Sequence, residues 1–428
     1  MPTSEAMQPL PGPLLPEDLL AEAVELLERL AAESSPSDEP QALRRMAALL
    51  ATELGARGLS VAIHDEPDEH GAALPVVVAT SPAADGARAG LPILLIGHFD
   101  TVLAAAPPRR EGRRLFATGA IDMKGGIVAF LKALDLLARR GVRPPALRLV
   151  LVPDEEVGGA ISRRAVAAAG AAATALWVLE PGEPRGDGET LVTGRRGMFH
   201  WRLVVCGQSA HSGLAFWQGR SALLAAAEWS ERAAALSRPL DGPTVNVARM
   251  AAGDQGWVAA ITRPDSEVGG GLASEAGFGS AHQLNVVPDR AVVEGEARFL
   301  RAEEGPQLAR ELAGLAAEIA SRREVGIDFT HDGAIPPVDP ASLPPVQADR
   351  AVALAARAGW ELLREADRGG ISFPNFLPEP GRVAVLDGLG PVGGGMHTRE
   401  EYVEVESLAR RIRLLADLLD AEAAPTDR

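Results

Sequence analysis

The 428-residue chain is poor in several residue types, and each shortage excludes a class of protein. It has one cysteine, Cys206, so it cannot form an internal disulfide, which fits a reducing compartment or a fold without covalent cross-links. Its formal net charge of -16 argues against a nucleic-acid binder, because such proteins need a basic surface to displace counterions. No apolar run approaches the length of a membrane-spanning helix. We therefore expect neither nucleic acid nor membrane among its partners.

The N-terminal segment also lacks the features of an export signal. It has no basic stretch followed by an apolar core, and it shows instead an amphipathic helical pattern that starts near Pro16. This predicts a cytoplasmic location. The remaining composition, 46% hydrophobic and 23% charged, is that of an ordinary globular protein with a sizeable core.

Along the chain, strand-like apolar runs alternate with helical patterns. VAIHDE, LPVVVAT and PILLIG precede the helical MKGGIVAFLKALDLLARRG, and ALRLVLVPDEE and ALWVLEP follow it. This rhythm predicts an α/β domain with a mostly parallel sheet and helices on both faces.

Near residue 194 the pattern changes to that of a sheet with one solvated face. TGRRGMFHWRLVVCG and HQLNVVPDRAVVEGEARFL alternate in polarity, and helices are predicted over 221–236 and 303–322. We therefore predict a first domain in two parts, 1–193 and 337–428, interrupted by an α+β domain over 194–336. Residues 266–281 are rich in glycine and predict a mobile loop.

Histidine and acidic residues stand where the predicted strands end or in adjoining loops. They are His98 after PILLIG, Asp122 after FATGAI, Glu155 and Glu156 after ALRLVLVPD, Glu180 after ALWVL, and His397 in GGGMHTREEY. Ligands of open α/β sheets gather outside the carboxyl ends of the strands, so we expect these side chains to converge. Taken singly, each has a plainer interpretation: Asp122 would cap a helix, and the glutamate pair would form a solvated turn.

Histidines and carboxylates without cysteine suit zinc, and a shared carboxylate allows a dinuclear site. Two dications would be balanced by Asp122, Glu156, Glu180 and one bridging hydroxide. Two ions roughly 3.5 to 4 Å apart can lower the pKa of a shared water and polarise a carbonyl. One carboxylate must stay free to accept the proton. Glu155 is the natural candidate, because neighbouring side chains in an extended segment point in different directions.

Five short motifs follow one another along the chain in the order GHFDTV, GAIDMKGG, PDEEVGG, LEP and GMHTREEYV. Over nearly its whole length the chain resembles the dinuclear zinc aminoacylase and carboxypeptidase family, which includes succinyl-diaminopimelate desuccinylase and acetylornithine deacetylase. The resemblance implies two Zn²⁺ per chain, with Co²⁺ or Mn²⁺ as substitutes. The implied ligands are His98, Asp122, Glu156, Glu180 and His397. It also implies that Asp122 bridges the ions, that Asp100 orients His98, and that Glu155 is the general base.

The inserted domain resembles the lid and dimerisation domain of this family. GQSAHSG places His211 where the family has a histidine that reaches the partner subunit and stabilises the oxyanion. HQLNVVPD places Asn285 where the family has a substrate-binding asparagine. GEARF places Arg298 where members of the family hold a substrate carboxylate. From the residues alone, His211 can equally be a surface histidine, and Arg298 can pair with Glu294 or Glu296.

The implied protein is a homodimeric hydrolase that cleaves an amide or peptide bond next to a free carboxylate. Metal-bound hydroxide would attack the carbonyl, with Glu155 as base, and the substrate would be a small acyl-amino acid or short peptide. Two departures leave its identity open. Ala334 and Ile335 stand where glutamate-releasing relatives carry an arginine, and Phe373 replaces an aspartate of the family.

Two other interpretations stay open. The run GLGPVGG, residues 388–394, matches G-x-G-x-x-G after a strand and would imply a dinucleotide-binding oxidoreductase. However, Pro391 interrupts the loop, and no further strand with an acidic residue follows. The other is a scaffold protein of the same fold without metals, although such a protein would normally lack a ligand or the base.

Overall fold

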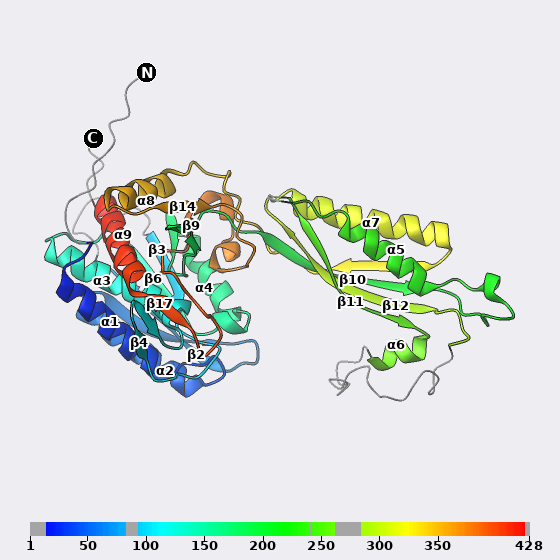
Figure 1. The fold of residues 1–428 in the computed structure, drawn as a ribbon, viewed down its shortest axis with the longest axis horizontal. Helices are drawn as coiled ribbons and strands as arrows, with labels where there is room; N and C mark the ends of the chain where they lie inside the picture. Colours follow the sequence, from blue (N-terminus) through cyan, green and yellow to red (C-terminus); the bar gives the residue numbers. More distant parts are fainter. Residues whose placement is uncertain (1–13, 83–92, 240–241, 262–283, 424–428) are drawn as a thin grey trace, which may run out of the picture. The chain divides into compact units, whose positions relative to one another are not determined.

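A computed structural model of the chain describes residues 14–82, 93–239, 242–261 and 284–423. The chain divides into two compact units (Figure 1). Unit 1 comprises Met1–Arg195, Pro340–Arg368 and Ser372–Arg428, and unit 2 comprises Arg196–Asp339 and Gly369–Ile371. The predicted glycine-rich loop, 266–281, lies outside the described residues. Among the described helices, none combines the length and apolar character that crossing a membrane requires.

A six-stranded sheet forms the centre of unit 1, in the order β1-β2-β6-β3-β7-β15. The strands are β1 (Ser60–Pro67), β2 (Ala73–Thr80), β3 (Ile93–His98), β6 (Leu147–Val152), β7 (Ala175–Val178) and β15 (Ala384–Leu386). Strands β6, β3, β7 and β15 are parallel, and β2 and β1 add an antiparallel edge. Every residue of β3 is buried, as expected for a strand covered on both faces. The predicted α/β fold with a mostly parallel sheet is confirmed.

Helices surround this sheet. They are α1 (Glu17–Ala32), α2 (Pro40–Ala56), α3 (Gly125–Arg139), α4 (Ala160–Gly170), α8 (Val346–Arg357) and α9 (Val405–Ala423). In Figure 1, α3 and α9 lie on one side of the sheet and α4 on the other. Gly141 follows the end of α3 with a φ of 70°, a conformation that favours glycine and terminates helices.

Two small sheets complete unit 1. One has the order β16-β17-β5-β4, and the other has the order β14-β9-β8. Their strands are β4 (Arg109–Glu111), β5 (Arg114–Phe116), β8 (Pro184–Arg185), β9 (Gly188–Val192), β14 (Leu362–Glu365), β16 (Gly393–Gly394) and β17 (Tyr402–Glu404). The run 388–394 therefore ends in a strand and does not open a helix. The dinucleotide-binding interpretation is wrong, since that fingerprint holds a pyrophosphate on a helix N-terminus.

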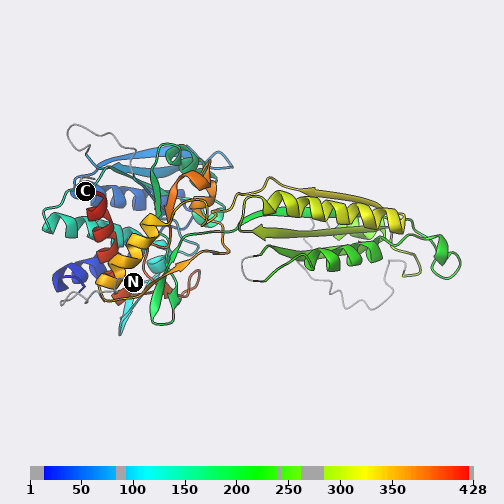
Figure 2. The same ribbon diagram turned by 90° about the horizontal axis from the view of Figure 1, so that it is seen from above.

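Unit 2 is a four-stranded antiparallel sheet in the order β11-β12-β10-β13. Its elements are β10 (Gly197–Cys206), α5 (Ala222–Ala234), β11 (Thr244–Gly253), α6 (Gln255–Ile261), β12 (Arg290–Phe299), α7 (Glu304–Arg323) and β13 (Gly326–His331). Figure 2 shows α5 and α7 running alongside each other. Their apolar faces share one core with the inward side chains of the strands, such as Trp201 and Leu203 of β10. The opposite face of the sheet is polar.

Candidate metal centre

The strand order of unit 1 brings several predicted residues to one edge of the sheet. His98 is the last residue of β3, and it pairs in register with Val152 at the end of the parallel strand β6. Glu155 and Glu156 follow β6, and Glu180 follows β7 on the other side of β3. The carboxyl ends of these strands meet at the same edge, so their polar side chains converge.

The converging side chains form two groups that share Asp122. His98 Nε2 lies 3.1 Å from Asp122 Oδ1 and 3.7 Å from Glu180 Oε1. His397 Nε2 lies 3.3 Å from Asp122 Oδ2 and 3.1 Å from Glu156 Oε2. Within each group one ligand atom per residue lies within 4.8 Å of the others. Each oxygen of Asp122 therefore serves a different group, which is the arrangement of a bridging carboxylate.

A glycine pair lets helix α3 approach this centre. A Cβ atom on Gly126 would lie 1.9 Å from the backbone oxygen of Leu179, the residue before Glu180. Only glycine permits so close a contact between a helix and the end of a strand. Asp122 precedes this helix in a separate turn, Ala120–Lys124, and does not cap it, so the plain capping interpretation is wrong.

Electrostatics at the centre fit cation binding. Burial raises the pKa of Glu156 to about 8, and the nearby Asp122 carboxylate acts in the same direction. Burial likewise raises the pKa of Glu180 well above its usual range. The hydrogen bond that His397 donates to the Asp122 carboxylate raises the pKa of His397 to about 9. Without metal, these carboxylates must share protons with each other and with the imidazoles to limit repulsion. A dication could replace those protons and use the same nitrogen and oxygen donors, which are typical ligands of zinc.

Asp100 connects His98 to the turn that carries the glutamates. Its Oδ1 lies 3.2 Å from His98 Nδ1, and its two oxygens accept the backbone N–H groups of Glu155 and Glu156, each at 3.2 Å. The hydroxyl of Ser37 also donates to Asp100 at 2.7 Å. Asp100 is fully buried, so these bonds hold both the imidazole ring and the glutamate turn.

Glu155 belongs to neither ligand group. Burial raises its pKa, the charge of His98 opposes the increase, and Asp122 adds to it. The glutamate pair lies in a 3₁₀ turn, Glu155–Val157, and not in the extended segment that we expected. The turn geometry and the two N–H bonds that Asp100 accepts therefore set the different orientations of Glu155 and Glu156.

Glu401, which no local pattern singled out, holds the backbone of Asp122 through its carboxylate. Its Oε2 accepts the N–H of Gly119 at 2.7 Å, and its Oε1 accepts those of Ile121 at 3.0 Å and Asp122 at 3.1 Å. Glu401 is only 4% exposed. Glu401 lies four residues after His397 in the same motif, and this was the one sign in the sequence that it could belong to the site. An acidic residue at that position could equally have faced solvent.

His397 itself has an uncommon backbone conformation, with a φ of 62°. Non-glycine residues seldom adopt this left-handed region, and where they do, the surrounding structure must compensate for the strain.

Phe373 is fully buried, and its ring centroid lies 6.4 Å from that of His98. Phe373 therefore gives the His98 ring an apolar neighbour.

The remaining predicted residues lie in unit 2. His211 is exposed, its Nδ1 accepts the N–H of Gly213 at 3.1 Å, and its Nε2 lies 3.2 Å from the side-chain amide of Asn285. Since Nδ1 is an acceptor, a neutral ring carries its proton on Nε2. The amide oxygen of Asn285 can accept that proton when the amide is turned accordingly. His211 and Asn285 thus form one polar pair.

Arg298 lies at the other end of the same sheet. Its Nε and Nη2 donate to Glu296 at 2.8 and 3.1 Å, which is one of the pairings considered from the sequence. Register places Arg298 opposite Met198, whereas Cys206, at the far end of β10, lies opposite Arg290. Eight residues of strand at about 3.3 Å each make roughly 26 Å between these ends.

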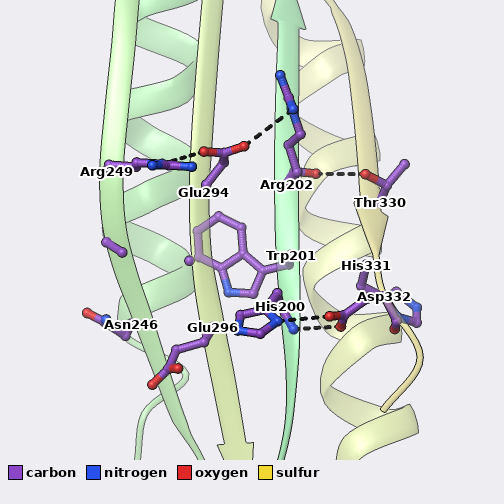
Figure 3. Close-up of a pocket in the computed structure, with 12 residues that line it drawn as sticks. His200, Trp201, Arg202, Asn246, Arg249, Glu294, Glu296, Thr330, His331 and Asp332 are labelled. Atoms are coloured by element: carbon purple, nitrogen blue, oxygen red, sulfur yellow. Dashed lines mark hydrogen bonds and ion pairs between the residues drawn. The ribbon is translucent and has the colours of Figure 1, made fainter. Parts of the chain in front are cut away.

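A cavity of about 510 Å³ lies on the open face of the unit 2 sheet (Figure 3). Several of its charged side chains are paired with one another, whereas Glu296 pairs with Arg298, outside the lining. Arg202 and Arg249 both contact Glu294, and His200 Nδ1 lies 2.8 Å from Asp332. None of the six converging residues of unit 1 lines it. Its lining residues all belong to unit 2.

Comparisons with known proteins agree with this geometry. Carboxypeptidase G2 of Pseudomonas sp. (strain RS-16) is 28% identical over 340 residues, which cover 78% of this chain and 74% of that protein. Succinyl-diaminopimelate desuccinylase of Granulibacter bethesdensis is 25% identical, covering 78% of this chain and 84% of the relative.

Solved structures show the same fold. Aminopeptidase PepT from Bacillus cereus has a TM-score of 0.74 at 20% identity and covers 96% of this chain and 100% of its own. An M20 family metallo-carboxypeptidase from Sulfolobus solfataricus has a TM-score of 0.62 at 16% identity, with coverages of 95% and 100%. The family model Peptidase family M20/M25/M40 matches residues 94–421. The chain therefore belongs to peptidase family M20/M25/M40, and it is a hydrolase of the metallopeptidase and amidohydrolase class.

Proposed function

We propose that this enzyme hydrolyses an amide or peptide bond next to a free carboxylate, in a short peptide or an N-acyl amino acid. The proposal includes two zinc ions per chain, with cobalt or manganese as substitutes. The proposed ligands are His98, Asp122, Glu156, Glu180 and His397. The observation that supports it most is that Asp122 offers one oxygen to each of two ligand groups while Glu155 stays outside both.

When bound, such ions lower the pKa of a shared water and polarise the substrate carbonyl. The side chains around them have separate tasks. Glu155 accepts a proton from the attacking water and donates it to the leaving nitrogen. Asp100 keeps His98 and the glutamate turn in place, and Glu401 fixes the backbone of Asp122.

We also propose that the enzyme is a homodimer through unit 2, and that His211 acts on the substrate of the partner subunit. In this proposal His211 stabilises the oxyanion, Asn285 binds the substrate, and Arg298 holds its carboxylate. The support is the strand of roughly 26 Å between Arg298 and the end of β10 that leads to His211. A dipeptide spans only about 7 Å, so one copy of unit 2 cannot bring both groups to the same substrate.

The decisive experiment is an activity screen of the zinc- or cobalt-loaded protein against N-acyl amino acids, dipeptides and N-carbamoyl amino acids. Each compound is paired with its C-terminal amide, which lacks the free carboxylate. We expect hydrolysis of the acids, much slower hydrolysis of the amides, and none after the metal is chelated. Equal rates for acids and amides, or activity that survives chelation, would contradict the proposal.

A cytoplasmic location is proposed from the thiol of Cys206, which is free and exposed and suits a reducing compartment. Fractionation of cells that express a tagged chain tests it. Recovery of the protein in the extracellular fraction would contradict it.

A further inference from the structure

The loop between His211 and helix α5 carries large apolar side chains in water. Leu214 is 86% exposed, Phe216 49% and Trp217 88%. We call these three residues the apolar pad. Single exposed apolar residues are ordinary, but three within four positions are a patch, and such patches usually mark a contact site.

The pad is held by defined contacts. The backbone N–H groups of Leu214 and Ala215 donate to the His211 carbonyl at 3.2 and 2.8 Å. The rings of Phe216 and Trp217 meet edge to face at 5.0 Å. Arg220 donates to the Trp217 carbonyl at 3.4 Å and also forms an ion pair with Glu324. These contacts order the backbone of the pad and hold the rings of Phe216 and Trp217 together, so a ligand can bind them with a reduced cost in entropy.

The position of the pad indicates what it contacts. Leu214 lies within one turn of His211, and Ser212 donates its N–H to the Asn285 carbonyl at 2.8 Å. The pad therefore adjoins the His211 and Asn285 pair, at the end of unit 2 remote from Arg298. If His211 lies next to the substrate, the apolar pad therefore lies close to the substrate as well.

We propose that the apolar pad contacts an apolar group next to the scissile bond, and that Leu214 and Trp217 determine specificity for such substrates. This inference rests on the proposed function and deepens it. The apolar group is either the acyl chain or the side chain of the released amino acid, and both have the same chemistry.

The size of the pad favours a small ligand over a second protein chain. Three such side chains offer roughly 400 to 500 Å² of surface. A stable protein interface needs about 800 Å² from each partner, so the pad alone falls well short of that area.

The test measures kcat/KM for two substrate series with the metal-loaded enzyme. One series lengthens the acyl chain of an N-acyl alanine, and the other lengthens the side chain of an N-acetyl amino acid. The variants are Trp217→Ala and Leu214→Ala. Ile63→Ala, which removes an apolar side chain 44% exposed on β1 of unit 1, is the matched control.

For wild type and Ile63→Ala we expect kcat/KM to rise by up to about fourfold per methylene in one of the series, which identifies the group that the pad binds. In both pad variants this rise should flatten, while the melting temperature and oligomeric state stay unchanged. Parallel rises in all four proteins, or no rise in wild type, would overturn the inference and leave the proposed function intact. If Trp217→Ala loses its dimer in light scattering, the pad is an interface between copies and the inference is wrong. If wild type hydrolyses nothing, the proposed function itself fails.

Discussion

Replacing Glu401 by glutamine should loosen the backbone that carries Asp122. The carboxylate accepts three backbone N–H groups, one through Oε2 and two through Oε1, of which those of Gly119 and Ile121 are buried. Glutamine keeps the shape but has only one acceptor oxygen. Whichever way its amide turns, at least one N–H group, such as that of Gly119, faces another donor.

The magnitude follows from the lost bonds. A hydrogen bond to a charged group contributes about 1.5 to 3 kcal/mol, and a buried donor left without a partner costs about 1 to 3 kcal/mol. Burial raises the pKa of Glu401, which shows that desolvation offsets part of this gain. We therefore expect a loss of about 2 to 4 kcal/mol and a fall in melting temperature on the order of 5 to 10 °C. Zinc affinity should fall about 10- to 100-fold, as is usual when a group supporting a ligand is removed.

The assay is a zinc titration against a chromophoric chelator, combined with thermal unfolding of the metal-free protein followed by circular dichroism. Glu400→Gln is the matched control, because its side chain is 73% exposed and pairs only with Arg109 and solvent among the contacts described. If Glu401→Gln matched Glu400→Gln in both zinc affinity and melting temperature, the positioning role of Glu401 would be refuted.

Four further outcomes test the proposed centre. Glu155→Gln should keep a metal content near two per chain by atomic absorption and lose about a hundredfold to ten-thousandfold in turnover; loss of metal would show that it is a ligand. Asp122→Ala should lose both metals together, because it holds each ion, and a variant with one tightly bound metal and most of its activity would indicate a mononuclear site. Mixing inactive His211→Ala chains with inactive Glu155→Gln chains should restore about a quarter of wild-type activity, since half of randomly exchanged dimers are mixed and each has one complete site; no recovery despite exchange shown by mixed-tag purification would exclude a partner-supplied histidine. Burial acts to raise the pKa of Glu365, but the hydrogen bond and charge of Arg368, with smaller contributions from Thr190 and Arg185, together lower it. The pair with Arg368 therefore stabilises the fold at neutral pH and stops doing so as pH falls through that lowered pKa. Urea unfolding between pH 7 and pH 3 should therefore show a smaller acid-induced loss for Glu365→Gln than for wild type, and equal losses would contradict the assignment.

Much of unit 1 could be predicted from local patterns. Continuous apolar runs such as Ile93–His98 indicate buried parallel strands, and parallel strands bring their carboxyl ends to one edge. That rule was enough to expect His98, Glu156 and Glu180 near one another. It did not require knowledge of which strand lies beside which.

Other features depended on how distant segments close upon each other. The expectation of an extended segment at Glu155 was wrong, because the turn after β6 is tightened by two N–H bonds to Asp100, more than fifty positions earlier. Glu401 lies 279 positions from Asp122, and no local pattern encodes a hydrogen bond across that separation. The pairing of Arg298 with Glu296 instead of Glu294 depended on side-chain geometry along one strand face.

The sequence by itself determined the class of fold and the residue types available for metal chemistry, because hydrophobic periodicity and the order of short motifs are local properties. Only the tertiary structure decided that the two oxygens of Asp122 point to different histidines, and that His211 and Arg298 lie at opposite ends of the unit 2 sheet. These facts follow from strand register and loop closure. Register is set by packing between segments that are remote in the chain, so it cannot be read from either segment alone.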